Sequence, residues 1–312
     1  LCVVFFFFFF LMVRRPTRFK LFSYQTLFRF KLGLIMQEMY GIDYLKPEVV
    51  LMQDTGIGVA EAAARTCYDS FSNSENKAIK YIENHMPDDS TCKEINSIGE
   101  SNLLNDLAWT YFHHSILEHA NLSYLIRGTS RGVLQEHARH RIQAISVRST
   151  RYTMSSVINA FIASQAKDDK EFFIDKILDF DMFVTCDKEY NKIEIGAMYD
   201  KLKYQSKKVE NFNDIAVAKS SLDFLEEFKD APQKLFEALE GGKKKRNVGD
   251  AFKHIITDNV KVDMVVTFNL RSLKNYLTLR DSGAAYFQIR WLAQEMMRKT
   301  PSKYLDLIIK KG

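Results

Sequence analysis

The stretch KVDMVVTFNLRSLKNYLTLR, residues 261–280, passes directly from one secondary-structure pattern to another. Its first ten residues are rich in β-branched and aromatic side chains, which predicts a strand. From Ser272 to Lys299 apolar residues recur at three-to-four spacing, which predicts a long amphipathic helix with a break near Gly283. This part of the chain therefore predicts a strand that leads straight into a helix.

The rest of the chain mixes the same two patterns. Residues 46–55 and 120–128 have strand composition, whereas residues 58–71 follow a Gly-rich turn and favour a helix. Helical patterns also cover residues 76–86, 100–119 and 129–141. Because strands and helices follow no strict βαβ rhythm, the pattern favours an α+β fold over a doubly wound one.

Bulk composition is that of an ordinary globular enzyme or binding protein. The chain has 312 residues, of which 46% are hydrophobic and 27% charged, with a formal net charge of +5. That charge permits an anionic ligand without indicating nucleic acid, whose binding proteins carry longer basic faces. The four cysteines are scattered with no CxxC pair, so we expect neither a disulfide framework nor a zinc ribbon and place the protein in the cytoplasm.

Two segments of the chain differ in composition from the rest: the N-terminal residues and an internal insertion. Residues 1–35 form a doubtful N-terminal extension, in which an apolar run precedes basic residues, the reverse of a secretory signal, and is too short to span a membrane. We expect these residues to be upstream sequence that is not part of the protein, with the true start at Met36 or Met39. A membrane anchor is the alternative. We expect residues 36–312 to form a single catalytic domain, with a charged helical insertion at about 160–250.

Positive charge is concentrated in EHARHRIQAISVRSTRYT, residues 136–153, which holds four arginines and two histidines against one acid, Glu136. Guanidinium groups beside Ser146, Ser149 and Thr150 form the usual surroundings of an anion. The alternative is a solvated basic face. An RNA-binding module is disfavoured because the arginines lack interleaved exposed aromatic residues.

Histidines also cluster, and their interpretation stays open. His113, His114, His119, His137 and His140 occupy one short part of the chain, with only Glu118 and Glu136 as nearby carboxylates. A metal-dependent nucleotide hydrolase using the His113–His140 cluster is therefore an alternative, beside packed or surface histidines. The sequence holds no Gly-rich Walker or dinucleotide fingerprint, no GxSxG and no HExxH.

A second polar group lies in the helix of the opening stretch. At 3.6 residues per turn, Arg271, Asn275 and Thr278 share one face, and Asn269, Tyr276 and Arg280 lie near the other. A helix that is polar on both faces is either exposed or placed between two polar ligands.

Together these segments resemble the flavin-dependent thymidylate synthases over residues 46–310, apart from the insertion. The family signature, RHR followed by seven residues and Ser, corresponds to Arg139-His140-Arg141, IQAISVR and Ser149, with Arg151-Tyr152 after it. HHSILEH, NLRSLKNYLTLR and AAARTCYDS resemble three further family segments in the same order.

The resemblance implies a fold, a reaction and an assembly. The fold is α+β, with a mixed or antiparallel central sheet flanked by long helices. The reaction is the reductive methylation of dUMP to dTMP, with 5,10-methylenetetrahydrofolate as carbon donor and FAD, reduced by NADPH, as hydride carrier. The family is a homotetramer with active sites shared between subunits, and binds neither nucleic acid nor membrane.

Site residues are carried over by position, and the resemblance implies no metal. Arg280 and His113 are the expected catalytic residues. The residues expected to hold FAD are His113, Ser115, Arg139, His140, Arg141, Asn269, Arg271 and Asn275. The residues expected to hold dUMP are Glu136, Ser149, Arg151, Lys253 and Arg280. Four positions depart from the family pattern: Glu136, Val147, Lys253 and Ala284.

Overall fold

A computed structural model describes residues 41–166, 168–207, 230–231, 234 and 253–310, with the backbone alone for residues 151–155. The doubtful extension at residues 1–35 and most of the expected insertion beyond residue 207 lie outside the described residues.

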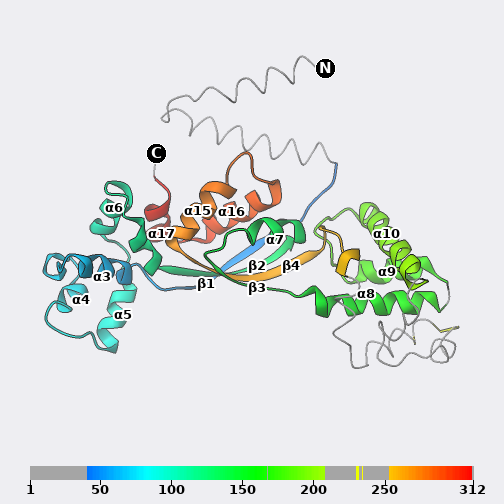
Figure 1. Cartoon of the computed structure of the whole chain (residues 1–312), viewed down its shortest axis with the longest axis horizontal. Helices are drawn as coiled ribbons and strands as arrows, with labels where there is room; N and C mark the ends of the chain where they lie inside the picture. The colour runs from blue at the N-terminus through cyan, green and yellow to red at the C-terminus, as the bar shows by residue number, and fades with distance from the viewer. Residues whose placement is uncertain (1–40, 167, 208–229, 232–233, 235–252, 311–312) are drawn as a thin grey trace, which may run out of the picture. The chain divides into compact units, whose positions relative to one another are not determined.

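A four-stranded antiparallel sheet forms the centre of the described chain, with strand order β1-β2-β4-β3 (Figure 1). β1 (Glu48–Asp54) pairs with β2 (Asn121–Ser130), which pairs with β4 (Lys261–Asn269). β3 (Ala144–Val147) pairs along the other edge of β4. The α+β expectation is confirmed.

One face of this sheet is buried and the other is more open, as period-two alternation dictates. Along β2, Leu122, Tyr124 and Ile126 are fully buried, whereas Ser123 and Leu125 between them are half-buried. The buried face meets α16 (Phe287–Lys299) and α15 (Leu270–Arg280). This packing fixes both helices against the sheet.

The helices between β1 and β2 in the chain begin after a tight turn at Gly56. Gly56 has a φ of +73°, and a Cβ atom there would lie 2.2 Å from the carbonyl oxygen of Asn96. Its amide donates to the hydroxyl of Tyr304, at 2.9 Å, which ties the turn to α17 (Ser302–Ile308). The elements of this region are α3 (Gly58–Cys67), η1 (Phe71–Asn73), α4 (Lys77–Tyr81), α5 (Asp89–Ser97), α6 (Asn102–Trp109) and η2 (His114–His119).

A second hydrophobic core lies among helices of the expected insertion. It centres on Phe161, Phe173 and Tyr199, whose rings meet at centroid distances of 5.4–6.1 Å. The elements that build it are α8 (Thr150–Gln165), α9 (Lys170–Asp179), α10 (Lys188–Ser206) and η3 (Lys253–Ile255). None of the described helices is long and apolar enough to cross a membrane.

Two details differ from the sequence expectation, and a third agrees with it. α7 (Arg131–His137) ends before the RHR motif, so Arg139 and Arg141 lie in a turn and not on a helix. The short strand β3 was not expected, because AISV is only four residues long. The long C-terminal helix is divided into α15 and α16, as the break near Gly283 predicts.

Candidate functional site

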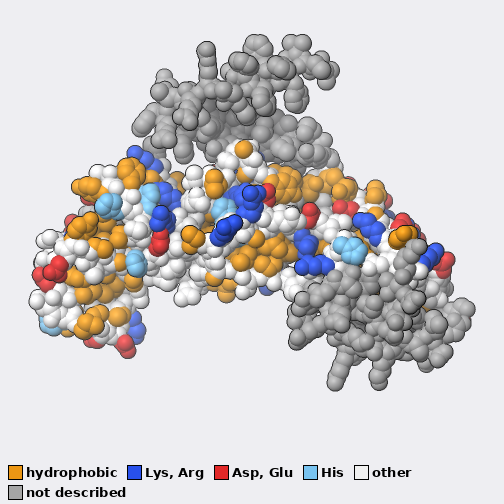
Figure 2. All heavy atoms as spheres, viewed as in Figure 1, with side chains coloured by type: hydrophobic (Ala, Val, Ile, Leu, Met, Phe, Trp, Pro, Cys, Tyr) orange, Lys and Arg blue, Asp and Glu red, His pale blue; other side chains and the backbone are white. Residues whose placement is uncertain are grey.

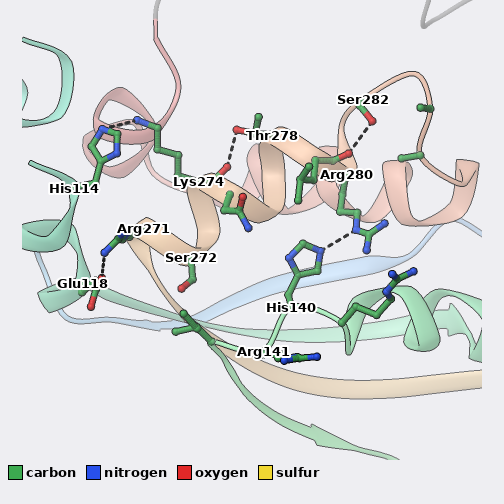
Figure 3. Close-up of a pocket in the computed structure, with 16 residues that line it drawn as sticks. His114, Glu118, His140, Arg141, Arg271, Ser272, Lys274, Thr278, Arg280 and Ser282 are labelled. Carbon is green, nitrogen blue, oxygen red and sulfur yellow. Dashed lines mark hydrogen bonds and ion pairs between the residues drawn. The ribbon is translucent and has the colours of Figure 1, made fainter. Parts of the chain in front are cut away.

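A cavity of about 1050 Å³ lies along α15, between that helix and the turn that follows α7 (Figure 3). Figure 2 shows Lys, Arg and His side chains gathered on the same face, between the places of α15 and α7 in Figure 1. The lining residues are His114, Glu118, Arg139, His140, Arg141, Ile142, Arg271, Ser272, Lys274, Asn275, Thr278, Leu279, Arg280, Ser282, Ala284 and Ala285.

Buried His137 anchors the turn that carries the RHR motif. The side-chain amide of Gln143 donates to the carbonyl oxygen of His137 at 3.1 Å, so its oxygen accepts from His137 Nε2, at 3.0 Å. His137 Nδ1 is then the acceptor for the Tyr276 hydroxyl, also at 3.0 Å. Burial lowers the pKa of His137 to about 4 and raises that of Tyr276, so both are neutral at pH 7.

Arg280 is held from two directions at the end of α15. Its Nε donates to His140 Nε2 at 2.9 Å, one Nη donates to the backbone carbonyl of Glu136 at 2.9 Å, and the other pairs with the Glu136 carboxylate. Burial and the neighbouring guanidinium lower the pKa of His140, so the imidazole is neutral and accepts this bond. These contacts fix the orientation of the guanidinium.

The opposite end of the cavity holds two further cations. Arg271 lies 2.5 Å from the Glu118 carboxylate in a pair that is about half exposed. Lys274 Nζ lies 4.2 Å from the centroid of the Trp109 ring and 3.2 Å from His114 Nε2 (Figure 3). Burial lowers the pKa of Lys274. This end therefore presents a second group of positive charge in the first half of α15, whereas Arg280 is the last residue of that helix.

A smaller cavity of about 510 Å³ adjoins the first, since His114 and Arg271 line both. Its walls come from the end of α3, the loop after α6 and the start of η2. The other lining residues are Ala64, Cys67, Tyr68, Leu107, Phe112, His113, Ser115 and Ile116.

The structure gathers most of the expected site residues around these two cavities. The first cavity brings together Arg139, His140, Arg141, Arg271, Asn275 and Arg280. His113 and Ser115 line the second, and Ala284, a departure from the family pattern, lines the first. The face assignment for α15 was wrong in part: Arg280 shares the cavity with Arg271, whereas Tyr276 is buried in the core.

Five expected residues line neither cavity. Asn269 caps α15 by accepting from the Ser272 amide at 2.8 Å. Glu136 reaches the cavity only through Arg280, and Ser149 precedes α8, exposed, without capping it. Lys253 is exposed in η3, and the side chain of Arg151 lies outside the described residues. Their expected roles stay predictions.

Sequence reasoning missed several lining residues. Lys274 lies three positions after Arg271, so helical spacing already placed it on the same face. His114 was considered as a metal ligand or as a packed or surface histidine, and not as part of a ligand cavity. The acidic partners of two arginines lie far from them in the sequence. Arg280 pairs with Glu136, and Arg148 lies 3.9 Å from the carboxylate of Asp263. Local sequence patterns cannot predict ion pairs between residues so far apart in the chain.

The charge balance of the larger cavity fits anionic ligands. Five cationic side chains line it and Glu118 is the one carboxylate among its described lining residues. Arg139 and Arg141 form no ion pair within the described part of the chain, which leaves their N–H donors for phosphate oxygens. The same part holds no group of three His, Cys, Asp or Glu side chains able to bind a metal ion, so the hydrolase alternative has no site there.

Comparison with known proteins identifies one family for this chain. A family model described as thymidylate synthase complementing protein matches residues 49–303. Flavin-dependent thymidylate synthases from Wolinella succinogenes and Campylobacter jejuni strain RM1221 are 29% and 27% identical over 256 and 262 residues. Each alignment covers 82% of this chain, and 94% and 93% of the respective relatives.

Solved structures show the same fold. The crystal structure of thymidylate synthase X from Helicobacter pylori with FAD and dUMP superposes with a TM-score of 0.50, at 22% identity. The match covers 84% of this chain and 97% of that chain. With a family model that spans most of its length, the chain belongs to the thymidylate synthase complementing protein family, whose relatives named above are flavin-dependent thymidylate synthases.

Proposed function

We propose that this enzyme converts dUMP to dTMP, with 5,10-methylenetetrahydrofolate as carbon donor and with FAD, reduced by NADPH, as hydride carrier. The observation that carries the proposal is the fixed guanidinium of Arg280 in a cavity lined by four further cations. Such a cavity suits two phosphate-bearing ligands that must meet.

FAD is the ligand for which the cavity residues are best suited. We propose that Arg139, His140, Arg141, Arg271 and Asn275 hold it in the first cavity, with Asn269 at the head of α15. His113 and Ser115 would contact it from the second cavity. Bound FAD would supply the reducing equivalents of the reaction, while the protein supplies position and charge.

For dUMP we propose a set of residues that only partly lines the described cavities. Arg280 and Glu136 form the fixed part, and Ser149, Arg151 and Lys253 would bind the nucleotide phosphate. Ser149 and Lys253 are exposed and line neither cavity. This is the arrangement expected if a neighbouring subunit contributes them, and we therefore propose a homotetramer with shared sites, acting in the cytoplasm.

Arg280 has a defined chemical task in this proposal. A guanidinium has five N–H donors, and the contacts to His140 and Glu136 use three of them. The two that remain can donate to a uracil carbonyl oxygen and stabilise negative charge that develops on the pyrimidine, which activates its C5 carbon. Since Glu136 and His140 already fix the side chain, little reorganisation is needed when that charge appears.

The test begins with the visible absorption spectrum of the purified protein. We expect an oxidised-flavin spectrum, present as purified or after addition of FAD, that bleaches when NADPH and dUMP are added. Formation of dTMP on further addition of 5,10-methylenetetrahydrofolate would complete the test. A protein that takes up no FAD, or one that reduces flavin without forming dTMP, would contradict the proposal.

A further inference from the structure

The carbonyl oxygen of His137 closes the turn that carries the RHR motif. It accepts from the backbone amide of His140 at 3.1 Å and from the side-chain amide of Gln143, also at 3.1 Å. A carbonyl oxygen has two lone pairs, and this one uses both of them within the turn. The backbone position of His140 therefore depends on His137 and on Gln143.

The ring of His137 determines which way the amide of Gln143 faces. The Tyr276 hydroxyl donates to Nδ1, so the ring proton lies on Nε2, which donates to the amide oxygen of Gln143. The amide nitrogen is then directed at the carbonyl. In the other tautomer Nε2 would accept, the amide would turn its nitrogen toward the ring, and its oxygen would meet the carbonyl oxygen. The Tyr276 hydroxyl therefore selects the tautomer in which both bonds of the turn are made.

Tyr276 also contacts His140 directly. The two rings meet edge to face at a centroid distance of 4.7 Å, and the ring of Tyr276 meets that of His137 in the same way at 5.0 Å. Tyr276 is fully buried. One side chain of α15 thus supports both histidines of the turn.

His140 is the part of this arrangement that reaches Arg280. Its Nε2 accepts from Nε of Arg280 at 2.9 Å (Figure 3). Tyr276 precedes Arg280 by four positions on α15, so the two residues are also neighbours along the helix. A continuous set of contacts thus runs from Gln143, through the buried tyrosine and the two histidines, to the guanidinium.

Filling the core does not by itself require the Tyr276 hydroxyl. A phenylalanine ring would occupy the same space, and a buried hydroxyl and a buried imidazole each cost free energy unless they are hydrogen-bonded. A polar group of this kind that is fully satisfied fixes one arrangement of its neighbours. The arrangement fixed here is that of the RHR turn.

We propose that Tyr276 and Gln143 are positioning residues for Arg280. They act through the two histidines and hold the turn where the His140 ring can accept from the guanidinium. The inference rests on the proposed function, in which this guanidinium stabilises negative charge that develops on the uracil ring. Because a donor aimed in advance needs no reorganisation when charge appears, loosening its support should slow the reaction more than it weakens substrate binding.

The test uses Tyr276→Phe and Gln143→Met in the full chain. The first removes only a hydroxyl, and the second replaces the amide of a half-buried side chain, so it should fold where the first does not. In each variant kcat for dTMP formation, counted per bound flavin, should fall by roughly 10-fold, the rate equivalent of one hydrogen bond. KM for dUMP should stay near its wild-type value, since the interaction that is lost belongs to the transition state.

Combination with Arg280→Ala shows whether the two residues act through Arg280. If they do, neither substitution should lower kcat further in an enzyme that already lacks the guanidinium. A role in stability alone would lower kcat by the same factor in both backgrounds, and that result would overturn the inference.

The matched control is Tyr124→Phe. It removes the hydroxyl of another fully buried tyrosine, which bonds to Thr300 Oγ1 at 2.7 Å outside both cavities. This variant should lose stability as Tyr276→Phe does, while kcat per bound flavin stays at the wild-type value.

Hydrogen exchange tests the positioning without any turnover. The segment 138–143 should exchange its amide protons faster in Tyr276→Phe and in Gln143→Met than in the wild type, because the His140 amide is bonded within the turn. Wild-type exchange or wild-type kcat in both variants would overturn the inference and leave the proposed function intact. A wild type that makes no dTMP would instead contradict the proposed function, and exchange would still test how the turn is held.

Discussion

The two arginine–glutamate pairs of α15 have the same chemistry and very different surroundings. Arg280 is 15% exposed and Glu136 35%, and the guanidinium also bonds to His140 and to a backbone carbonyl. Arg271 and Glu118, at the other end of the helix, are 55% and 45% exposed and bond only to each other among the described contacts.

This difference indicates that the Arg280 end of the cavity is preorganised, whereas the Arg271 end can adjust to a ligand. An exposed pair is screened by water and contributes little to stability, so a ligand can displace its carboxylate at small cost. A guanidinium held by three hydrogen bonds cannot turn away without breaking them. We therefore expect chemistry at the Arg280 end and adjustable ligand binding at the Arg271 end.

The largest effect should follow from Arg280→Ala. Removing a fixed donor that stabilises developing charge typically lowers kcat by about 100- to 1000-fold. The flavin spectrum should be retained, since Arg139, Arg141 and Arg271 remain. Stopped-flow measurement of dTMP formation, beside an absorption spectrum, checks both points.

The matched control is Arg298→Ala, which removes an exposed arginine from an ion pair with Glu295 outside both cavities. It should turn over like the wild type. If Arg280→Ala were equally active, Arg280 would have no part in the reaction.

The second prediction concerns acid and the rigid end of the site. In the folded protein the pKa of His137 is about 4, below its usual 6.5, so the unfolded chain binds the proton more readily. Stability is therefore full above pH 6.5 and falls as pH decreases toward 4, by about 3 kcal/mol for this group. Urea unfolding between pH 4 and pH 7.5 measures it.

A variant sharpens the assignment to one histidine. His137→Asn removes the titrating group, so the unfolding free energy should depend less on pH between 6.5 and 4 than in the wild type. Equal pH dependence in both proteins would mean that other groups, such as half-buried His140, dominate acid unfolding.

The third prediction tests the RHR turn. Arg139→Ala removes a cation that lines the cavity without an ion-pair partner among the described residues, so little stability should be lost. FAD should bind about 10-fold more weakly, the effect of one charge-assisted hydrogen bond. Flavin fluorescence titration gives the Kd, and an unchanged value would remove Arg139 from the FAD site.

Local patterns in the sequence predicted much of the fold. β4 and α15 follow the switch from strand to helix composition in residues 261–280, and the break near Gly283 separates α15 from α16. β3 was missed because its four residues gain their stability by pairing with β4, which no local pattern encodes. α7 ends early because His137 bonds to Gln143 and Tyr276, a tertiary arrangement.

The candidate site, too, could be predicted from local patterns only in part. Spacing and resemblance identified the arginines, since their residue types and positions lie in the sequence itself. What each arginine contacts was not predictable, because Arg280 meets Glu136 from 144 positions away and Arg271 meets Glu118 from 153.

The smallest effect should come from Glu118→Gln at the adjustable end. Because the Arg271–Glu118 pair is about half exposed, its loss should change the unfolding free energy by less than about 1 kcal/mol. The substitution also removes the one carboxylate among the described residues of the cavity wall, so FAD should bind more tightly, by less than about 10-fold. Arg280 keeps its partners, and kcat should change little. A large loss of FAD affinity would instead show that Glu118 orients Arg271 for the ligand, which would make this end as preorganised as the other.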